Sequence, residues 1–229
     1  MTGTAFARRV KRRVSARIQE FFAVCPPGLR QACARELTGL DARIRDIQVV
    51  PGGVTFYARI MDACLANLWL GSPSRILMRL ARFRASQFST LEKKLSDIDW
   101  HLFLPAGTIP AIQVTTRTSR LYHSDAIADR CRPIVRAALG IGQIKDNLFD
   151  PERVPQTIMI RAENDRFDIS LDMSGVPLFQ RGTKTQKIPA PLRENLAFAI
   201  LNAAGFTDQD VLMDPMCGSG TFAIEGAMI

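Results

Sequence analysis

The stretch that decides the fold is VLMDPMCGSGTF, residues 211–222. Its first three residues are apolar and indicate a buried strand, and the residues from Phe222 onward indicate the start of a helix. Between them, Gly218 and Gly220 lack Cβ atoms, so backbone amides can approach a ligand closely. The helix would present its positive dipole end at the same place. A strand, a glycine turn and a helix in this order predict a ligand-binding loop.

Asp214 stands where the expected strand ends, and its carboxylate can accept hydrogen bonds from ligand hydroxyl or amino groups. That geometry suits an adenosyl cofactor. A P-loop would instead need Gly-Lys-Ser/Thr, and a dinucleotide loop would need a third glycine where this chain has Ala223. The candidate cofactor-binding residues are Asp214, Cys217, Gly218, Ser219, Gly220 and Thr221.

The string DPMCGSGT, residues 214–221, resembles motif I of class I S-adenosylmethionine-dependent methyltransferases, particularly those acting on exocyclic amino groups. Further stretches resemble a family of RNA methyltransferases that contain a THUMP domain: NLWL (67–70), SRLYH (119–123), SLDMSG (170–175), FQRG (179–182) and APLRENL (190–196). The chain departs from the family at residues 183–184, which are Thr-Lys where the family usually has Tyr-Arg.

The resemblance implies S-adenosylmethionine as cofactor and structured RNA, ribosomal RNA in particular, as partner, with the exocyclic amino group of guanine as target. The implied fold class is α+β. A ferredoxin-like domain and a THUMP domain would together grip RNA, followed by the first elements of a Rossmann-like α/β methyltransferase domain. The expected division is a basic arm at 1–18, the ferredoxin-like domain at 19–62, the THUMP domain at 63–175, a basic linker at 176–191 and the start of the methyltransferase domain at 192–229.

The hydrophobic pattern predicts alternating strands and helices before this domain. Strands are expected at 20–24, 49–58 (as a hairpin or bulged strand), 76–85 and 112–116, with a hairpin formed by 157–162 and 166–172; helices are expected near 29–38, 62–70, 89–98, 124–139 and 192–204. Asp62, Ser89 and Ser124 are expected to cap three of these helices.

Three finer expectations concern the helices themselves. Leu65, Leu68 and Trp69 would form the apolar face of the second helix. Leu192, Leu196 and Ile200 would line one face of the last complete helix, which Pro191 would open. Pro133 should kink or shorten the helix that contains it, because proline lacks the amide that bonds one turn back.

The formal charge of +8 is concentrated at the N-terminus, where six basic residues precede the first acidic residue, Glu20. A flexible basic arm can release counterions from phosphates, which favours a nucleic acid partner; a merely solvated tail stays open, and an organellar transit peptide is disfavoured by the few apolar residues. The candidate RNA-binding residues are Arg75, Arg82, Arg84, Arg117, Arg120, Tyr122, Lys184 and Lys187, with Tyr122 as a stacking ring.

Composition excludes several other classes. No apolar run approaches the roughly 18 residues of a membrane span, and the first residues are too charged for a secretory signal, so a soluble, cytoplasmic protein is expected. The five cysteines are scattered and read as reduced, mostly buried thiols. His101 and His123 have no second ligand at metal spacing, so no metal is expected.

Methylation of an exocyclic amine uses, in this family, an Asn/Asp-Pro-Pro-aromatic loop, and no such tetrapeptide occurs here. A lone strand and helix also cannot bury both faces of a parallel strand. We therefore expect the chain to be an N-terminal part of a longer enzyme that is inactive alone. The alternative is a non-catalytic RNA-binding module in which the motif at 214–221 is a remnant.

Overall fold

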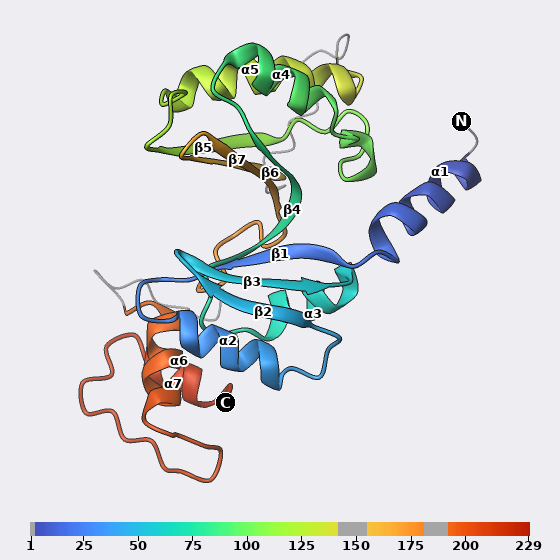
Figure 1. Ribbon diagram of the computed structural model, residues 1–229. Helices are drawn as coiled ribbons and strands as arrows, with labels where there is room; N and C mark the ends of the chain where they lie inside the picture. Colours follow the sequence, from blue (N-terminus) through green and yellow to red (C-terminus); the bar gives the residue numbers. More distant parts are fainter. Residues whose placement is uncertain (1–2, 142–154, 181–191) are drawn as a thin grey trace.

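The computed structural model describes residues 3–141, 155–180 and 192–229. Within these ranges, seven strands form one sheet in the order β2-β3-β1-β4-β7-β6-β5 (Figure 1). Only β5 and β6 run parallel; every other neighbouring pair is antiparallel. The strands are β1 Gln19–Val24, β2 Arg45–Val50, β3 Gly53–Ala58, β4 Arg75–Arg84, β5 Ala111–Arg117, β6 Thr157–Glu163 and β7 Arg166–Asp172.

The first half of the sheet is ferredoxin-like. Strand β1 leads into α2 (Arg30–Gly39), and the β2–β3 hairpin leads into α3 (Ile60–Trp69) and then β4. This β-α-β-β-α-β order, with β1 between β3 and β4, is the ferredoxin-like arrangement, so the expected architecture of this region is confirmed. The boundary expected between residues 62 and 63 falls inside α3.

The second half of the sheet carries α4 (Phe88–Ser96) and α5 (Ser124–Ala138) on one face. Its core contains Trp100, which is fully buried and donates its indole N–H to the Leu95 carbonyl at 3.0 Å. Phe83 and Phe167 stack across β4 and β7 with ring centroids 5.8 Å apart. The apolar residues that form the sequence pattern of this region are the ones that pack in its core.

Strand β4 belongs to both halves. Its residues 75–78 pair with β1 and its residues 77–84 pair with β7, so only two residues are bonded on both sides. In Figure 1, α4 and α5 lie above the sheet whereas α2 and α3 lie below it. The helix-free faces therefore turn toward each other, and a Cβ on Gly52 in the β2–β3 turn would lie 3.4 Å from the Arg161 guanidinium of β6.

The expected caps were wrong. The residues that precede α3, α4 and α5 are Arg59, Gln87 and His123, and none makes a side-chain cap hydrogen bond. Instead, α3 and α4 begin with Ile60 and Phe88, which pack against the cores of the two halves. Helices in proteins gain most of their stability from tertiary packing. The packing of these first-turn side chains therefore determines where the two helices begin.

Two expected helix faces were also wrong. Helix α3 buries Ala63 and Ala66, while Leu68 and Trp69 are 72% and 70% exposed. Helix α6 (Glu194–Ala203) buries Ala197, Ala199 and Leu201, and leaves Ile200 exposed. In both helices buried alanines approach the neighbouring elements closely, and some of the larger apolar side chains, such as Trp69 and Ile200, are exposed. Pro133 does not shorten α5, which continues to Ala138; Pro191 lies outside the described residues.

The basic arm is not a flexible tail. Residues Gly3–Val10 form α1 and Lys11–Ser15 continue as a π-helical turn, η1. Arg9 and Arg13 both bond Asp99, with N···O distances of 3.0 and 2.7 Å, and Val14 is buried. The arm is held by apolar packing and ion pairs that the sequence pattern did not indicate.

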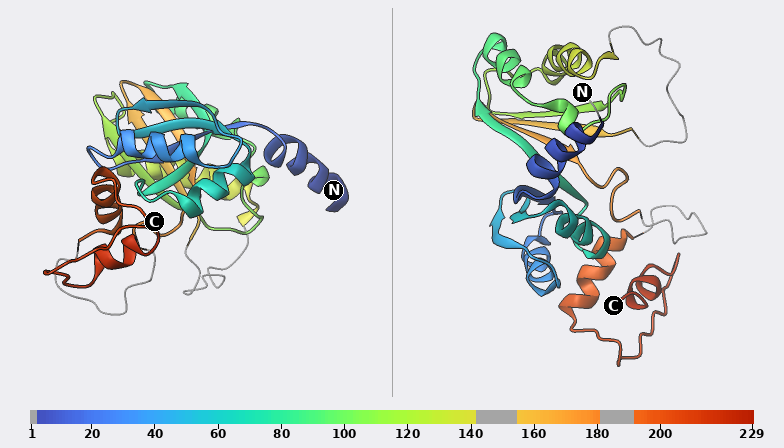
Figure 2. Two further views of the ribbon diagram at one scale, coloured as in Figure 1. Left: turned by 90° about the horizontal axis from the view of Figure 1, so that it is seen from below. Right: turned by 90° about the vertical axis from the view of Figure 1, so that its right-hand side faces the viewer.

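The expected strand at Val211–Met213 is absent: these residues are coil, and no described residue pairs with them. Val211 and Met213 are 96% and 85% exposed. A parallel strand forms only against hydrogen-bonded neighbours, which the described residues do not supply here. The flanking helices α6 and α7 (Thr221–Gly226) pack against each other beside the ferredoxin-like half (Figure 2).

Cysteine burial follows the expectation in part. Cys25, Cys33 and Cys131 are buried, Cys64 is half-buried and Cys217 is exposed. Burial raises the pKa of the Cys131 thiol to about 12, so it stays protonated near neutral pH. Among the described residues, no helix combines the length and apolarity needed to cross a membrane.

Candidate cofactor loop and RNA-facing surface

The glycine turn of the candidate cofactor loop is formed. Gly218 and Gly220 have φ angles of +53° and +72°, in the left-handed region that glycine adopts without a Cβ penalty. The Gly220 amide donates to the Cys217 carbonyl at 2.7 Å, and Gly220 directly precedes α7. The turn therefore leads directly into the first residue of α7, as expected for this stretch of the sequence.

The polar residues of the loop form hydrogen bonds within the loop and to the segment before α6. Asp214 Oδ1 accepts the Met216 amide at 3.0 Å, a local turn typical of aspartate. The hydroxyls of Ser219 and Thr221 lie 3.2 Å apart, and Thr221 is buried and donates to the Leu192 carbonyl at 3.4 Å. Thr221 thus fixes the loop to the chain that enters α6, while Cys217 remains exposed.

Helix α6 is seated on the ferredoxin-like half through two contacts. Asn195 is fully buried, and its Nδ2 donates to the Ser72 carbonyl at 3.4 Å. A Cβ on Gly71 would lie 2.4 Å from the Phe198 ring, so this residue has to be small. The Glu36 carboxylate accepts the Gly71 amide at 2.6 Å and also bonds Ser72, which holds the segment in place.

The contact between α6 and residues 71–72 was not predicted from the sequence. Asn195 lies in the APLRENL stretch that carried the family resemblance, so a signal was present for it. For Glu36 and Gly71 there was none, because nothing in the pattern of α2 indicates that it faces the loop after α3.

Four RNA candidates are exposed at one end of the second half. Arg117 and Arg120 have side chains 79% and 77% exposed, with acidic partners at 3.8 and 3.6 Å. The Asp165 carboxylate accepts the Arg120 amide at 2.7 Å and so shapes the loop that follows β5. Tyr122 is 64% exposed, with its ring centroid 4.0 Å from that of His123, and Arg84 is also exposed.

Two other candidates, the half-buried Arg75 and the exposed Arg82, are paired with acidic residues of the protein. Arg75 pairs with the buried Asp172 and donates to the Gly175 carbonyl at 2.7 Å. Arg82 pairs with both Glu20 and Asp168, at 2.6 and 2.7 Å. These partners give both arginines a structural role. Lys184 and Lys187 lie outside the described residues.

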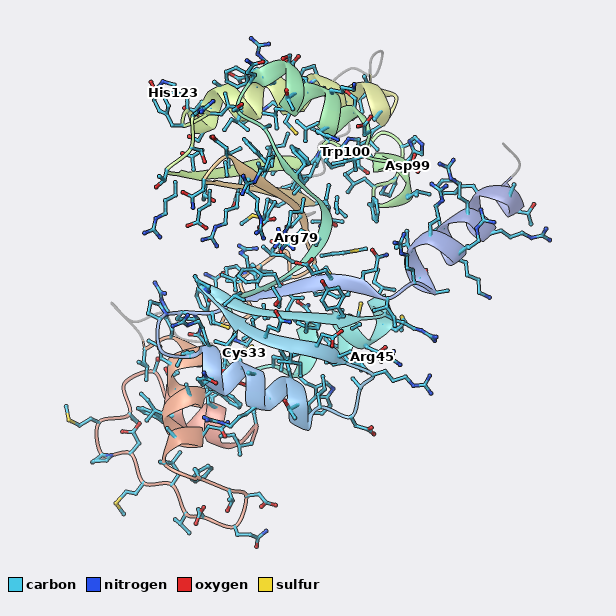
Figure 3. All side chains as sticks on the ribbon, viewed as in Figure 1. Cys33, Arg45, Arg79, Asp99, Trp100 and His123 are labelled. Carbon is cyan, nitrogen blue, oxygen red and sulfur yellow. The ribbon has the colours of Figure 1, made fainter. Side chains whose placement is uncertain are left out.

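Sequence reasoning missed the charged network between the two halves, which is centred on Arg79 of β4 (Figure 3). The Arg79 side chain is only 10% exposed and lies 3.6 Å from Glu20 of β1 and 3.5 Å from Asp168 of β7. It also donates to the Ser170 hydroxyl at 2.8 Å. Burial lowers the pKa of Arg79, and Asp168 and Glu20 oppose that shift. The three-residue spacing from Arg82 would place the two arginines on opposite faces of a regular strand. The register of β4 shifts between Arg79 and Ala81, and the sequence does not indicate this shift.

Across the described ranges, no group of three histidine, cysteine or acidic side chains could hold a metal ion. The chemistry of the loop is that of backbone amides and hydroxyls at a helix start, which suits a ligand recognised by hydrogen bonds.

Two stretches of the chain match domain models of known protein families. Residues 20–77 match the RlmL ferredoxin-like domain, and residues 181–229 match the RMKL-like methyltransferase domain. The first match agrees with the strand order of the first half, and the second includes the glycine turn. The chain is thus related to the methyltransferases that combine these two domains.

Individual relatives support this assignment. The chain is 36% identical, over 92% of its length, to the ribosomal RNA large subunit methyltransferase K/L of Methylococcus capsulatus, of which it covers 29%. A crystal structure of SMU.472, a putative methyltransferase complexed with S-adenosylhomocysteine (SAH), aligns with a TM-score of 0.73 at 30% identity over 92% of this chain. A predicted N6-adenine-specific DNA methylase from Listeria monocytogenes aligns with a TM-score of 0.77 at 25% identity over 93% of this chain.

The chain spans less than a third of that curated relative and 55% of each of the two solved chains. The resemblance inferred from the sequence is confirmed: residues 20–77 and 181–229 match the ferredoxin-like and methyltransferase domain models of this family.

Proposed function

We propose that this chain is the RNA-binding portion of an S-adenosylmethionine-dependent RNA methyltransferase whose target is the exocyclic amino group of guanine in ribosomal RNA. The observation that carries the proposal is the left-handed Gly218–Gly220 turn at the start of α7, with Asp214 before it. Residues 192–229 would begin a Rossmann-like domain, with Asp214, Cys217, Gly218, Ser219, Gly220 and Thr221 on the cofactor.

Residues 63–175 would act as the THUMP domain and contact structured RNA. Guanidinium groups suit phosphate oxygens, and an exposed aromatic ring suits an unstacked base. By exposure, Arg84, Arg117, Arg120 and Tyr122 are the better placed of the candidates. The Arg117–Tyr122 loop is braced by Asp165, so it can present its charges in one fixed arrangement.

Replacing both Arg117 and Arg120 with alanine should weaken the binding of structured RNA about tenfold, and that of a single-stranded homopolymer much less. The reason is that a braced loop can recognise shape, whereas generic positive charge cannot. Filter binding of both RNAs by both proteins measures the difference. The matched control is Arg35→Ala with Arg132→Ala, which removes the same charge from exposed positions on α2 and α5.

Equal losses on both RNAs, or losses no larger than those of the control, would reduce the loop arginines to generic charge. Failure of the unaltered chain to bind either RNA would remove the RNA-binding proposal itself.

A second candidate, a non-catalytic RNA-binding module, is favoured by one observation: Val211 and Met213 are exposed coil, and no strand among the described residues stands behind the cofactor loop. Without neighbouring strands, the walls for ribose and adenine are incomplete. Isothermal calorimetry should therefore detect no S-adenosylmethionine binding by this chain at ligand concentrations of about 1 mM. Micromolar binding that Gly220→Val abolishes would contradict this expectation and favour a complete pocket.

A further inference from the structure

Helix α1 and the turn η1 have three distinct faces. Val10 and Val14 pack against the core of the ferredoxin-like half. Arg9 and Arg13, one turn apart, point to Asp99. Arg8, Lys11 and Arg12 are exposed and make no ion pair with any described residue. One face thus anchors the arm, a second face fixes it by charge, and the third remains available for anions.

Asp99 is well placed to fix the arm's direction. It lies between α4 and the short 3-10 turn Trp100–Leu102, in the second half of the molecule, whereas the arm leads into β1 of the first half (Figure 3). The buried Trp100 anchors the neighbouring backbone, and the Leu102 amide donates to the Asp99 carbonyl at 2.9 Å. One carboxylate oxygen, Asp99 Oδ2, accepts both guanidinium groups.

We propose that α1 and η1 form a fixed, cationic contact for duplex RNA, and that Asp99 is the positioning residue that holds it in the binding direction. The inference rests on the proposed RNA-binding function. Residues one turn apart on a helix are separated by roughly 6 Å along its axis, so Arg8 and Arg12 form a set of charges with constant spacing. Phosphates of a duplex are also held at constant positions, and RNA helices are recognised largely by shape.

Asp99 has two effects on RNA binding, one electrostatic and one entropic, and their opposite signs make the inference testable. As a negative charge, Asp99 repels phosphates, so its neutralisation by itself should strengthen the binding of every RNA. Asp99 also fixes the arm before binding, so the arm loses less conformational entropy when it binds a duplex, which strengthens that binding. A flexible single strand can adapt to a free arm, so it should register only the first effect.

The test is Asp99→Asn in the full chain, with Asp97→Asn as matched control. Asp97 is exposed two residues away and makes no ion pair with the described residues, so both variants remove the same charge from nearly the same place. We expect Asp97→Asn to bind a duplex RNA and a single-stranded homopolymer as tightly as the unaltered chain or slightly better. We expect Asp99→Asn to lose about three- to tenfold on the duplex alone, the scale set by two partly exposed ion pairs.

Hydrogen exchange provides the second readout. Amides of residues 4–15 should exchange faster in Asp99→Asn than in Asp97→Asn, while the amides around Trp100 keep their protection. Duplex binding by Asp99→Asn that equals or exceeds that of Asp97→Asn would overturn the inference, as would unchanged exchange in the arm. Neither result would affect the proposed function, which fails only if the unaltered chain binds no RNA.

Discussion

Replacement of Arg79 with alanine is expected to lower the free energy of unfolding by about 3 kcal/mol, which equilibrium unfolding in urea would measure. The change leaves Glu20 and Asp168, which are 15% and 17% exposed, without their buried partner. We place the loss at the lower end of the range for broken buried ion pairs because Arg82 still contacts both carboxylates. Only two residues of β4 are paired with both β1 and β7, so few backbone hydrogen bonds join the two halves there. The side chains of Glu20 on β1, Arg79 on β4 and Asp168 on β7 add ion pairs at this junction.

Two controls make this prediction specific. Arg84→Ala removes an exposed arginine from the same strand and should change stability by less than about 0.5 kcal/mol. In the Arg79→Ala background, Asp168→Asn should recover part of the loss, because Glu20 and Arg82 then remain as a neutral pair. If Arg79→Ala were no more destabilising than Arg84→Ala, the network would not be a joint between the halves.

The affinity of the chain for duplex RNA is expected to fall by roughly two to three decades between about 50 and 200 mM salt, if about five phosphates are neutralised. Counterions released from those phosphates make binding weaker as salt rises. Removal of residues 1–17 should flatten the dependence. If three of the contacts come from Arg8, Lys11 and Arg12, about one decade of the fall should remain.

Filter binding across a salt series measures both slopes. Arg35→Ala with Arg132→Ala serves as the control, since these positions lie on α2 and α5 and should leave the slope nearly unchanged. An unchanged slope after removal of the arm would show that other cations make the phosphate contacts, and would contradict the role proposed for α1.

The order and type of the main elements could be predicted because each has a strong local pattern. The hairpin of β6 and β7 alternates cleanly, and Phe167, Ile169 and Leu171 are all buried as expected. The glycine turn at Gly218 and Gly220 could be predicted because positive φ angles favour glycine.

Features set by distant residues could not be predicted. Which face of α3 is buried depends on how closely its alanines approach the sheet, and the sequence pattern favoured the larger Leu68 and Trp69. Asp99 lies 90 and 86 residues from the arginines that it holds, so the docking of the arm has no local signal. Val211–Met213 has the composition of a strand but no hydrogen-bonding neighbour among the described residues.

Because β4 pairs with strands of both halves, the two halves are difficult to express as separate polypeptides. The ferredoxin-like match ends at residue 77, inside that strand, whose remaining residues pair with β7. A polypeptide cut at this position would divide β4, so that β7 would lose its pairing with Leu77 and β1 its pairing with Met78, and each product would keep only a shortened edge strand. Unpaired sheet edges recruit other strands and aggregate. Expression of the two halves as separate domains would therefore expose backbone groups at residues 77–78 that the intact chain pairs on both sides.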